Sequence, residues 1–181
     1  MAGLIGDRTG VAKGMMGVAQ MSLLDGRYAE ARDGMMQVDP IFEAVGDRWL
    51  YLSAIGVLGR ALQYLGEHEQ ARDTALKQLD GSIELGDGTM MAMALHDLAS
   101  YAAQSGDFER GLRLDGASRA LVDRLGGGAP TALIGVLQPD ELAAAAGVAA
   151  DAINRWFAEG RELSEEAALA LARESVESSP T

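Results

Sequence analysis

Residues 45–88 read VGDRWLYLSAIGVLGRALQYLGEHEQARDTALKQLDGSIELGDG, and this stretch contains one complete copy of the repeat that predicts the fold. Its opening VGDR corresponds to IGDR at residues 5–8 and to LGDG at residues 85–88, with a degenerate LGGG at residues 125–128. Its midpoint, GEHEQAR, corresponds to GRYAEAR from Gly26 and GDFERGL from Gly106. Two interleaved glycine series that share a period of 40 residues predict an internal repeat.

The glycines punctuate helix-forming sequence about every 20 residues, which is the pattern of a chain of antiparallel helices. Glycine reaches the left-handed conformation that ends a helix, and an aspartate after it can cap the next one. Asp7, Asp47, Asp87 and Asp107 stand at such positions. Pro40 is expected to kink or break the second helix after Asp39. First helices are expected near 8–24, 47–65 and 88–105, and second helices near 27–38, 67–85 and 107–125.

Apolar residues recur within each repeat at i, i+3, i+4 and i+7, the stripe by which one helix packs on another. The sequence therefore predicts an all-α fold, an α-α superhelix of three 40-residue helical hairpins. The hairpins are expected at about 5–45, 46–85 and 86–126, together residues 1–126. A linker at 127–138 and a two-helix C-terminal cap at 139–181 with a frayed tail are expected to follow.

Composition narrows the classes of function. The 181 residues include no cysteine, so disulfides, thiolate metal sites and a cysteine nucleophile are excluded. The net charge is −12, which repels nucleic acid unless a basic patch is present, and no such patch is visible. We see no signal peptide and no apolar run long enough to span a membrane, so a cytoplasmic location without membrane contact is expected.

The repeat resembles the tetratricopeptide repeat, through its small packing residue, Gly-x-Tyr and downstream alanine. Its 40-residue length and GDR starts are similar to the C-terminal repeat region of LuxR-type and AfsR-type bacterial transcriptional regulators. FAEGRELSEEAALALA, Phe157–Ala172, is similar to the end of those arrays. The resemblance implies a helical solenoid for signalling through protein–protein interaction in transcriptional regulation. The GxxxxGK[ST] loop of the regulators' ATPase module is absent.

The resemblance also implies which residues line the concave face of the solenoid. These are the first-helix residues that lie off the packing stripe, and they are expected to bind a protein or peptide partner. Lys13 and Arg60 would place cations in a cleft of an acidic protein and select a carboxylate or an acidic peptide. Association of two or more copies stays open. The predicted partner-binding residues are Lys13, Met16, Gln20, Arg60, Gln63, Met93, His96 and Ser100.

No catalytic constellation is visible. His68 and His96 lie far apart, and neither forms the i, i+3 or i, i+4 set of ligands that a metal site on one helix needs. Nothing resembles the GxSxG of a nucleophile turn. We therefore expect no enzyme activity, no metal and no cofactor. A small-ligand or enzyme site in the cleft, using His96 and Arg60, stays an alternative.

Residues 140–160, DELAAAAGVAADAINRWFAEG, carry a second alternative. Ala143, Gly147 and Ile153 have the spacing of a helix-turn-helix DNA-binding motif. Of the exposed residues expected on the second helix, Asn154 and Arg155 are able to contact bases or phosphates. Asp140, Glu141 and Asp151 oppose DNA binding, so a capping segment over the last repeat is the favoured interpretation.

Overall fold

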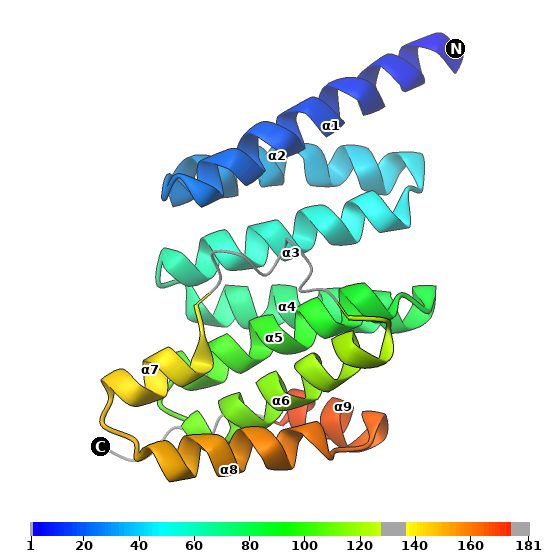
Figure 1. Cartoon of the computed structure of the whole chain (residues 1–181). Helices are drawn as coiled ribbons and strands as arrows, with labels where there is room; N and C mark the ends of the chain where they lie inside the picture. Colours follow the sequence, from blue (N-terminus) through cyan, green and yellow to red (C-terminus); the bar gives the residue numbers. More distant parts are fainter. Residues whose placement is uncertain (1, 128–136, 175–181) are drawn as a thin grey trace. The chain divides into compact units, whose positions relative to one another are not determined.

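The computed structural model describes residues 2–127 and 137–174, and every regular element in these ranges is an α-helix (Figure 1). The predicted linker at 127–138 and the predicted frayed tail lie mostly outside the described residues. The helices are α1 (Ala2–Leu24), α2 (Tyr28–Val45), α3 (Arg48–Tyr64), α4 (His68–Leu85), α5 (Gly88–Gln104), α6 (Phe108–Arg124), α7 (Pro139–Ala145), α8 (Ala150–Arg161) and α9 (Glu165–Arg173).

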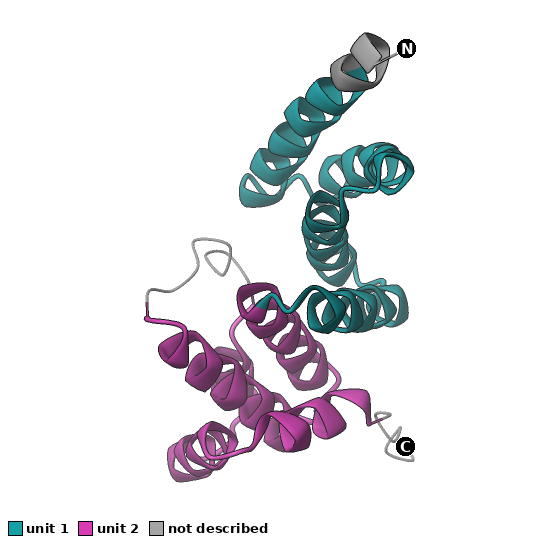
Figure 2. Cartoon of the chain, turned by 90° about the vertical axis from the view of Figure 1, so that its right-hand side faces the viewer, with its two compact units in different colours: residues 1–87 teal, residues 88–181 magenta. Residues whose placement is uncertain are grey.

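The chain divides into two compact units (Figure 2). Unit 1, residues 1–87, contains α1 to α4, and each of these helices packs on the next one along the chain. Unit 2, residues 88–181, contains α5 and α6 as a third hairpin, with α7, α8 and α9 packed on it. The predicted all-α class, built from sequentially packed helices, is confirmed.

The glycine series ends the helices as predicted. Gly26, Gly46, Gly66, Gly86 and Gly106 all have positive φ, between 66° and 86°. Their backbone N–H groups donate to carbonyls of the preceding turn, which satisfies the last carbonyls of each helix. The period of the sequence is therefore the period of the turns.

Aspartates that follow these glycines cap two of the helices. The Asp47 side chain accepts a hydrogen bond from the Leu50 amide at 3.1 Å, and the Asp107 side chain accepts one from the Arg110 amide at 3.3 Å. An oxygen at this position satisfies one of the free N–H groups of the first turn. The prediction for these two aspartates is confirmed.

Two boundaries in the first hairpin differ from the prediction. Helix α1 begins at Ala2, so Asp7 lies inside the helix and does not cap it. Helix α2 continues through Pro40 to Val45, so of the kink or break expected after Asp39 the break is wrong. Pro40 removes one hydrogen bond to the Met36 carbonyl, but both residues are exposed, so water is able to satisfy that carbonyl.

In the second hairpin and again in the third, a side chain of the second helix donates a hydrogen bond to a main-chain carbonyl of the first helix. Gln78 of α4 donates from Nε2 to the carbonyl of Leu52 at 3.3 Å. Forty residues later, Ser118 of α6 donates from Oγ to the carbonyl of Ala92 at 2.7 Å. The sequence repeat is thus also a repeat of tertiary contacts.

In the part of the chain that the structure describes, the third hairpin is followed by three helices, one more than expected. Helix α8 packs directly on α6, and the crossing is close because two glycines meet there. A Cβ atom at Gly116 would lie 2.2 Å from the carbonyl oxygen of Phe157, and one at Gly160 would lie 2.1 Å from that of Arg113. Only glycine permits these two backbones to approach so closely.

Candidate partner-binding surface

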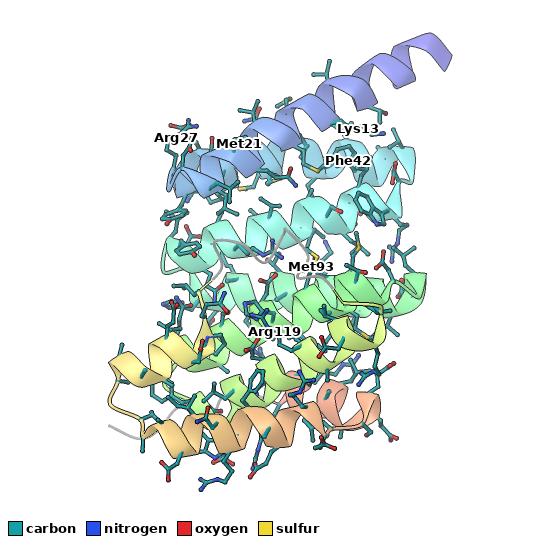
Figure 3. The ribbon with its side chains drawn as sticks, in the orientation of Figure 1. Lys13, Met21, Arg27, Phe42, Met93 and Arg119 are labelled. Atoms are coloured by element: carbon teal, nitrogen blue, oxygen red, sulfur yellow. The ribbon has the colours of Figure 1, made fainter. Side chains whose placement is uncertain are left out.

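The predicted concave-face residues of unit 1 have unequal exposure. Lys13 is exposed on α1 (Figure 3), and Met16 and Gln20 are half-buried there. Arg60 and Gln63 on α3 are each only 4 % exposed. The prediction that Arg60 and Gln63 line an open face is therefore wrong.

In unit 2, Met93 is half-buried, whereas His96 and Ser100 are fully buried. The predicted exposure of His96 and Ser100 is also wrong, because their side chains point into the packed unit. The Nδ1 atom of His96 lies 2.7 Å from Oδ1 of Asp115 on α6. In unit 2, residues that were predicted to line a cleft, such as His96, instead help to hold the hairpin together.

Repeat-equivalent positions show why the prediction of the concave face failed. Gly56 corresponds to His96, and a Cβ atom at Gly56 would lie 2.3 Å from Nε2 of Gln78 on α4. This position therefore faces the second helix of its own hairpin in both repeats. The helical spacing of the sequence identifies a buried stripe, but it does not tell which of two flanking helices covers each edge.

A buried polar cluster surrounds His96. Asp115 also lies 3.5 Å from Nε of Arg119, and Arg119 donates to Oε1 of Gln138 at 3.1 Å. Ser100 donates from Oγ to the Leu137 carbonyl at 2.6 Å and to the His96 carbonyl at 3.1 Å. These bonds attach residues 137 and 138 to α5 and α6. Both acceptors of Ser100 are main-chain carbonyl oxygens.

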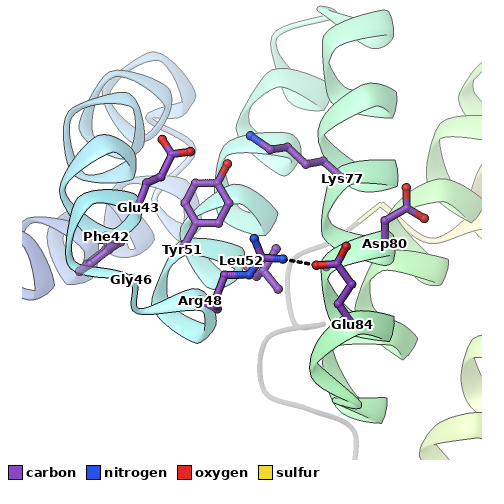
Figure 4. A pocket seen from close by; sticks show the side chains of 10 residues that line it. Phe42, Glu43, Gly46, Arg48, Tyr51, Leu52, Lys77, Asp80 and Glu84 are labelled. Atoms are coloured by element: carbon purple, nitrogen blue, oxygen red, sulfur yellow. Dashed lines mark hydrogen bonds and ion pairs between the residues drawn. The ribbon is translucent and has the colours of Figure 1, made fainter.

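A hollow of about 430 Å³ lies where the ends of α2, α3 and α4 meet (Figure 4). Phe42, Tyr51 and Leu52 form part of its lining, and Arg48 forms an ion pair with Glu84 across it. Lys77 lies 4.9 Å from the centre of the Tyr51 ring. A hydrogen bond to Tyr51 raises the pKa of Lys77. The charges of this hollow are largely satisfied within the chain.

Asp39 lies half-buried on α2 near this hollow, and its Oδ1 atom is buried without a hydrogen-bond partner. Burial raises the pKa of Asp39, nearby Lys77 lowers it, and Glu43 raises it further. A carboxyl group with a raised pKa in the folded state destabilises the fold increasingly as pH rises through that pKa. The ionised form is thus the unfavourable one at neutral pH.

Asp39→Asn is therefore expected to raise the melting temperature at pH 7, because the amide keeps the shape and removes the charge. The advantage should shrink as pH falls, because the raised pKa of Asp39 means that the wild-type carboxyl takes up its proton more readily in the folded state than in the unfolded state. Thermal unfolding followed by circular dichroism between pH 3.5 and 8 measures both. An Asp39→Asn variant that is less stable than wild type at pH 7 would contradict this account.

The exposed apolar side chains gather most densely on α1. Val11, Val18, Met21 and Leu24 are 57 %, 67 %, 55 % and 58 % exposed. Met21 and Lys13 are labelled on this helix in Figure 3. We call Gly10, Val11, Gly14, Gly17, Val18 and Met21 the open face of α1, because their spacing places them on one side of the helix.

Five of these six positions are buried one repeat later, and the sixth, Leu58, is half-buried. Tyr51, the equivalent of Val11, is 6 % exposed, and Ala61, the equivalent of Met21, is 0 % exposed. Helix α3 packs on α2 as well as on its hairpin partner α4, whereas α1 packs mainly on α2. The open face of α1 thus corresponds to a face that is covered on α3.

A groove of about 470 Å³ runs between the open face and α2. Val11, Gly14 and Val18 line its α1 side, and Glu30 and Gly34 line its α2 side. The lining is mainly apolar, and Glu30 is paired with Arg27. The groove and the open face together form a continuous apolar surface within unit 1.

The helix-turn-helix alternative rests on α7 and α8. Ala143 is fully buried, Gly147 has φ +84°, and Asn154 and Arg155 are exposed. Arg155 lies 3.8 Å from Glu159 and over the Trp156 ring. DNA binding through this segment stays a prediction, and salt-sensitive retention of duplex DNA at low ionic strength tests it.

Comparison with known proteins adds no family: no protein-family model matches the chain, and no curated protein matches it. In the described ranges, no helix is long and apolar enough to cross a membrane. Nor do the described residues contain a group of three or more histidine, aspartate or glutamate side chains placed to hold a metal ion.

Sequence reasoning missed the open face of α1. Val18 corresponds to Leu58 and Leu98 on the helical stripe that predicts packing, but its side chain is 67 % exposed. One sequence signal was available, since Gly10, Gly14 and Gly17 lie within one helix, where glycine is unfavourable. Three such glycines on one side of a helix indicate a role outside the isolated helix.

Proposed function

We propose that the chain is a protein-interaction module that binds a protein or peptide partner through the open face of α1 and the adjoining groove. The observation that carries the proposal is the exposure of Val11 and Met21 at positions that are buried in the next repeat. Contiguous apolar surface of this kind marks interaction sites in soluble proteins.

The energetics support a partner. Covering a fully exposed valine or methionine contributes roughly 1.5–3 kcal/mol. Val11, Val18 and Met21 of the open face are 55 % to 67 % exposed, so covering them would contribute somewhat more than half of this amount for each side chain. The resemblance to the repeat regions of bacterial transcriptional regulators adds an expected setting for the interaction, in signalling.

Site-specific photo-crosslinking tests the proposal. With p-benzoylphenylalanine in place of Val18, irradiation of cells that express the chain is expected to yield a covalent adduct with one or a few proteins, identified by mass spectrometry. Met36 on α2 provides the matched control, because it is 59 % exposed but lies outside the open face. Equal adducts from positions 18 and 36, or none from position 18, would remove the support for this site.

A further inference from the structure

We infer that the partner of the open face is an amphipathic α-helix with acidic flanks from another protein, lying on α1 as α2 lies on α3. This inference rests on the proposed function and specifies its ligand. Three observations support it: the repeat geometry, the surroundings of the glycines and the charges beside the open face.

The repeat geometry gives the shape of the ligand. On α3 the equivalent positions Leu50, Tyr51, Ala54 and Val57 are 1 % to 8 % exposed. Helix α3 packs on α2 and α4, and Phe42 of α2 lines a hollow together with Tyr51, the equivalent of Val11, and Leu52. A face with the same register on α1 is therefore shaped for a helix that enters from the same side.

The glycines indicate how near that helix comes. Among helical glycines whose surroundings are described, eight would place a Cβ atom 3.3 Å or less from a neighbouring atom. Gly10, Gly14 and Gly17 are the exceptions, with nothing within 4 Å. In the described helices, glycine thus marks a close neighbour everywhere except on the open face of α1. If a second helix packed its backbone against Gly10, Gly14 and Gly17, these three glycines would also have a close neighbour, like the other eight.

The charges give the polarity of the ligand. Lys13 and Arg8 are exposed, one along each edge of the open face, and residues 8–24 contain no acidic side chain. Arg48, the equivalent of Arg8, pairs with Glu84, but Ala44 stands at the position equivalent to Glu84. Two cations without an ion pair in the described chain favour a ligand with acidic flanks.

The chain's own α2 has this chemistry. It buries Met35, Val38 and Phe42 along one stripe, and residues 28–45 carry four acidic side chains and one arginine. A synthetic peptide with the sequence of residues 28–45 is therefore a suitable probe. A lactam between Asp33 and a lysine introduced by Gln37→Lys, both at exposed positions, would hold the peptide helical.

The experiment measures binding of this fluorescent peptide to the full chain by anisotropy. Saturable binding is expected, weakened at least about tenfold by Val18→Asp and little changed by Met36→Asp. Lys13→Glu should weaken binding and reduce its dependence on salt. A peptide with Val38→Ser and Phe42→Ser provides the matched control probe and should not bind.

The effects of Gly14→Ala distinguish a surface on which a helix docks from one that binds nothing. Because the new methyl group meets nothing in the free chain, the melting temperature should rise. Peptide binding should nevertheless fall several-fold, since the methyl group would stand between two helix backbones. A Gly14→Ala chain that binds the peptide as well as wild type would overturn the inferred close approach.

The outcomes distinguish the two proposals. If position 18 crosslinks to a partner but the stapled peptide does not bind, the helical ligand is wrong and the interaction site stands. If sedimentation shows a dimer of the chain that Val18→Asp dissociates, the occupant is a second copy, and the inference is likewise overturned. If position 18 gives no adduct, the proposed function itself fails.

Discussion

Gly160→Ala is expected to detach α8 from α6 and to lower the free energy of unfolding of unit 2 by about 3 kcal/mol or more. The added methyl group would lie 2.1 Å from the Arg113 carbonyl oxygen and 2.7 Å from the Arg113 Cα atom. Both neighbours are backbone atoms, so no change of side-chain rotamer relieves the overlap. The two helices must separate, which exposes the half-buried Trp156 and Phe157.

Tryptophan fluorescence reports this change directly. The chain has two tryptophans, Trp49 in unit 1 and Trp156 on α8, so Trp49→Phe leaves Trp156 as the single reporter. In that background, Gly160→Ala should shift the emission to longer wavelength and lower the urea midpoint.

The same substitution at Gly14 is the matched control. It adds the same methyl group to an exposed helix position with nothing within 4 Å, and should stabilise the chain by about 0.5–1 kcal/mol. Effects of opposite sign are therefore expected from one chemical change. An unchanged urea midpoint and Trp156 emission in Gly160→Ala would show that the α6–α8 crossing is looser than the structure has it.

The turns and most helix boundaries were predictable because their causes are local. Gly46 and Gly66 adopt the left-handed conformation for which glycine is suited, and Asp47 caps α3 by accepting a hydrogen bond from the amide three positions after it. Both features need information from only a few neighbouring residues. A period of 40 residues then extends each local interpretation to the other repeats.

The concave face and the C-terminal helices were harder, because their causes lie far away in sequence. His96 is buried by a partner on α6, 19 residues later, and Gly116 is required by α8, 41 residues later at Phe157. Pro40 is a different case, since its local rule was sound. The rule was overridden where the lost hydrogen bond faces solvent.

The open face of α1 lies between these cases. Its apolar residues were visible in the sequence, but their exposure depends on which helices the fold places beside α1. Val18 and Leu58 occupy equivalent positions, and only the structure distinguishes the exposed residue from the half-buried one. The repeat therefore predicts which type of residue stands at each position, but it does not predict whether that residue is buried on α1.

Asp115→Ala is expected to lower the free energy of unfolding of unit 2 by about 2–4 kcal/mol, because it leaves a buried imidazole unpaired. His96 is 0 % exposed, its Nε2 atom already has no hydrogen-bond partner, and Asp115 holds its Nδ1 atom. Arg119, the second contact of Asp115, has a side chain 31 % exposed and is able to turn toward water.

Asp123→Ala provides the matched control on the same helix. Asp123 also pairs with an arginine, Arg161, at 2.8 Å, but its side chain is 59 % exposed. Removal of an exposed partner should cost less than about 1 kcal/mol. Urea unfolding followed by circular dichroism compares the two variants, and equal costs would show that the His96–Asp115 bond contributes little beyond an exposed ion pair.

A double-mutant cycle then isolates the bond from the burial of His96. The second hairpin has Gly56 and Ala75 at the positions of His96 and Asp115, so the repeat folds without this polar pair. His96→Leu/Asp115→Ala removes the imidazole together with its acceptor and should destabilise less than the sum of the two single changes. Strict additivity would mean that the two side chains act separately. A cost for Asp115→Ala that falls in the His96→Leu background would assign the loss to the unpaired imidazole.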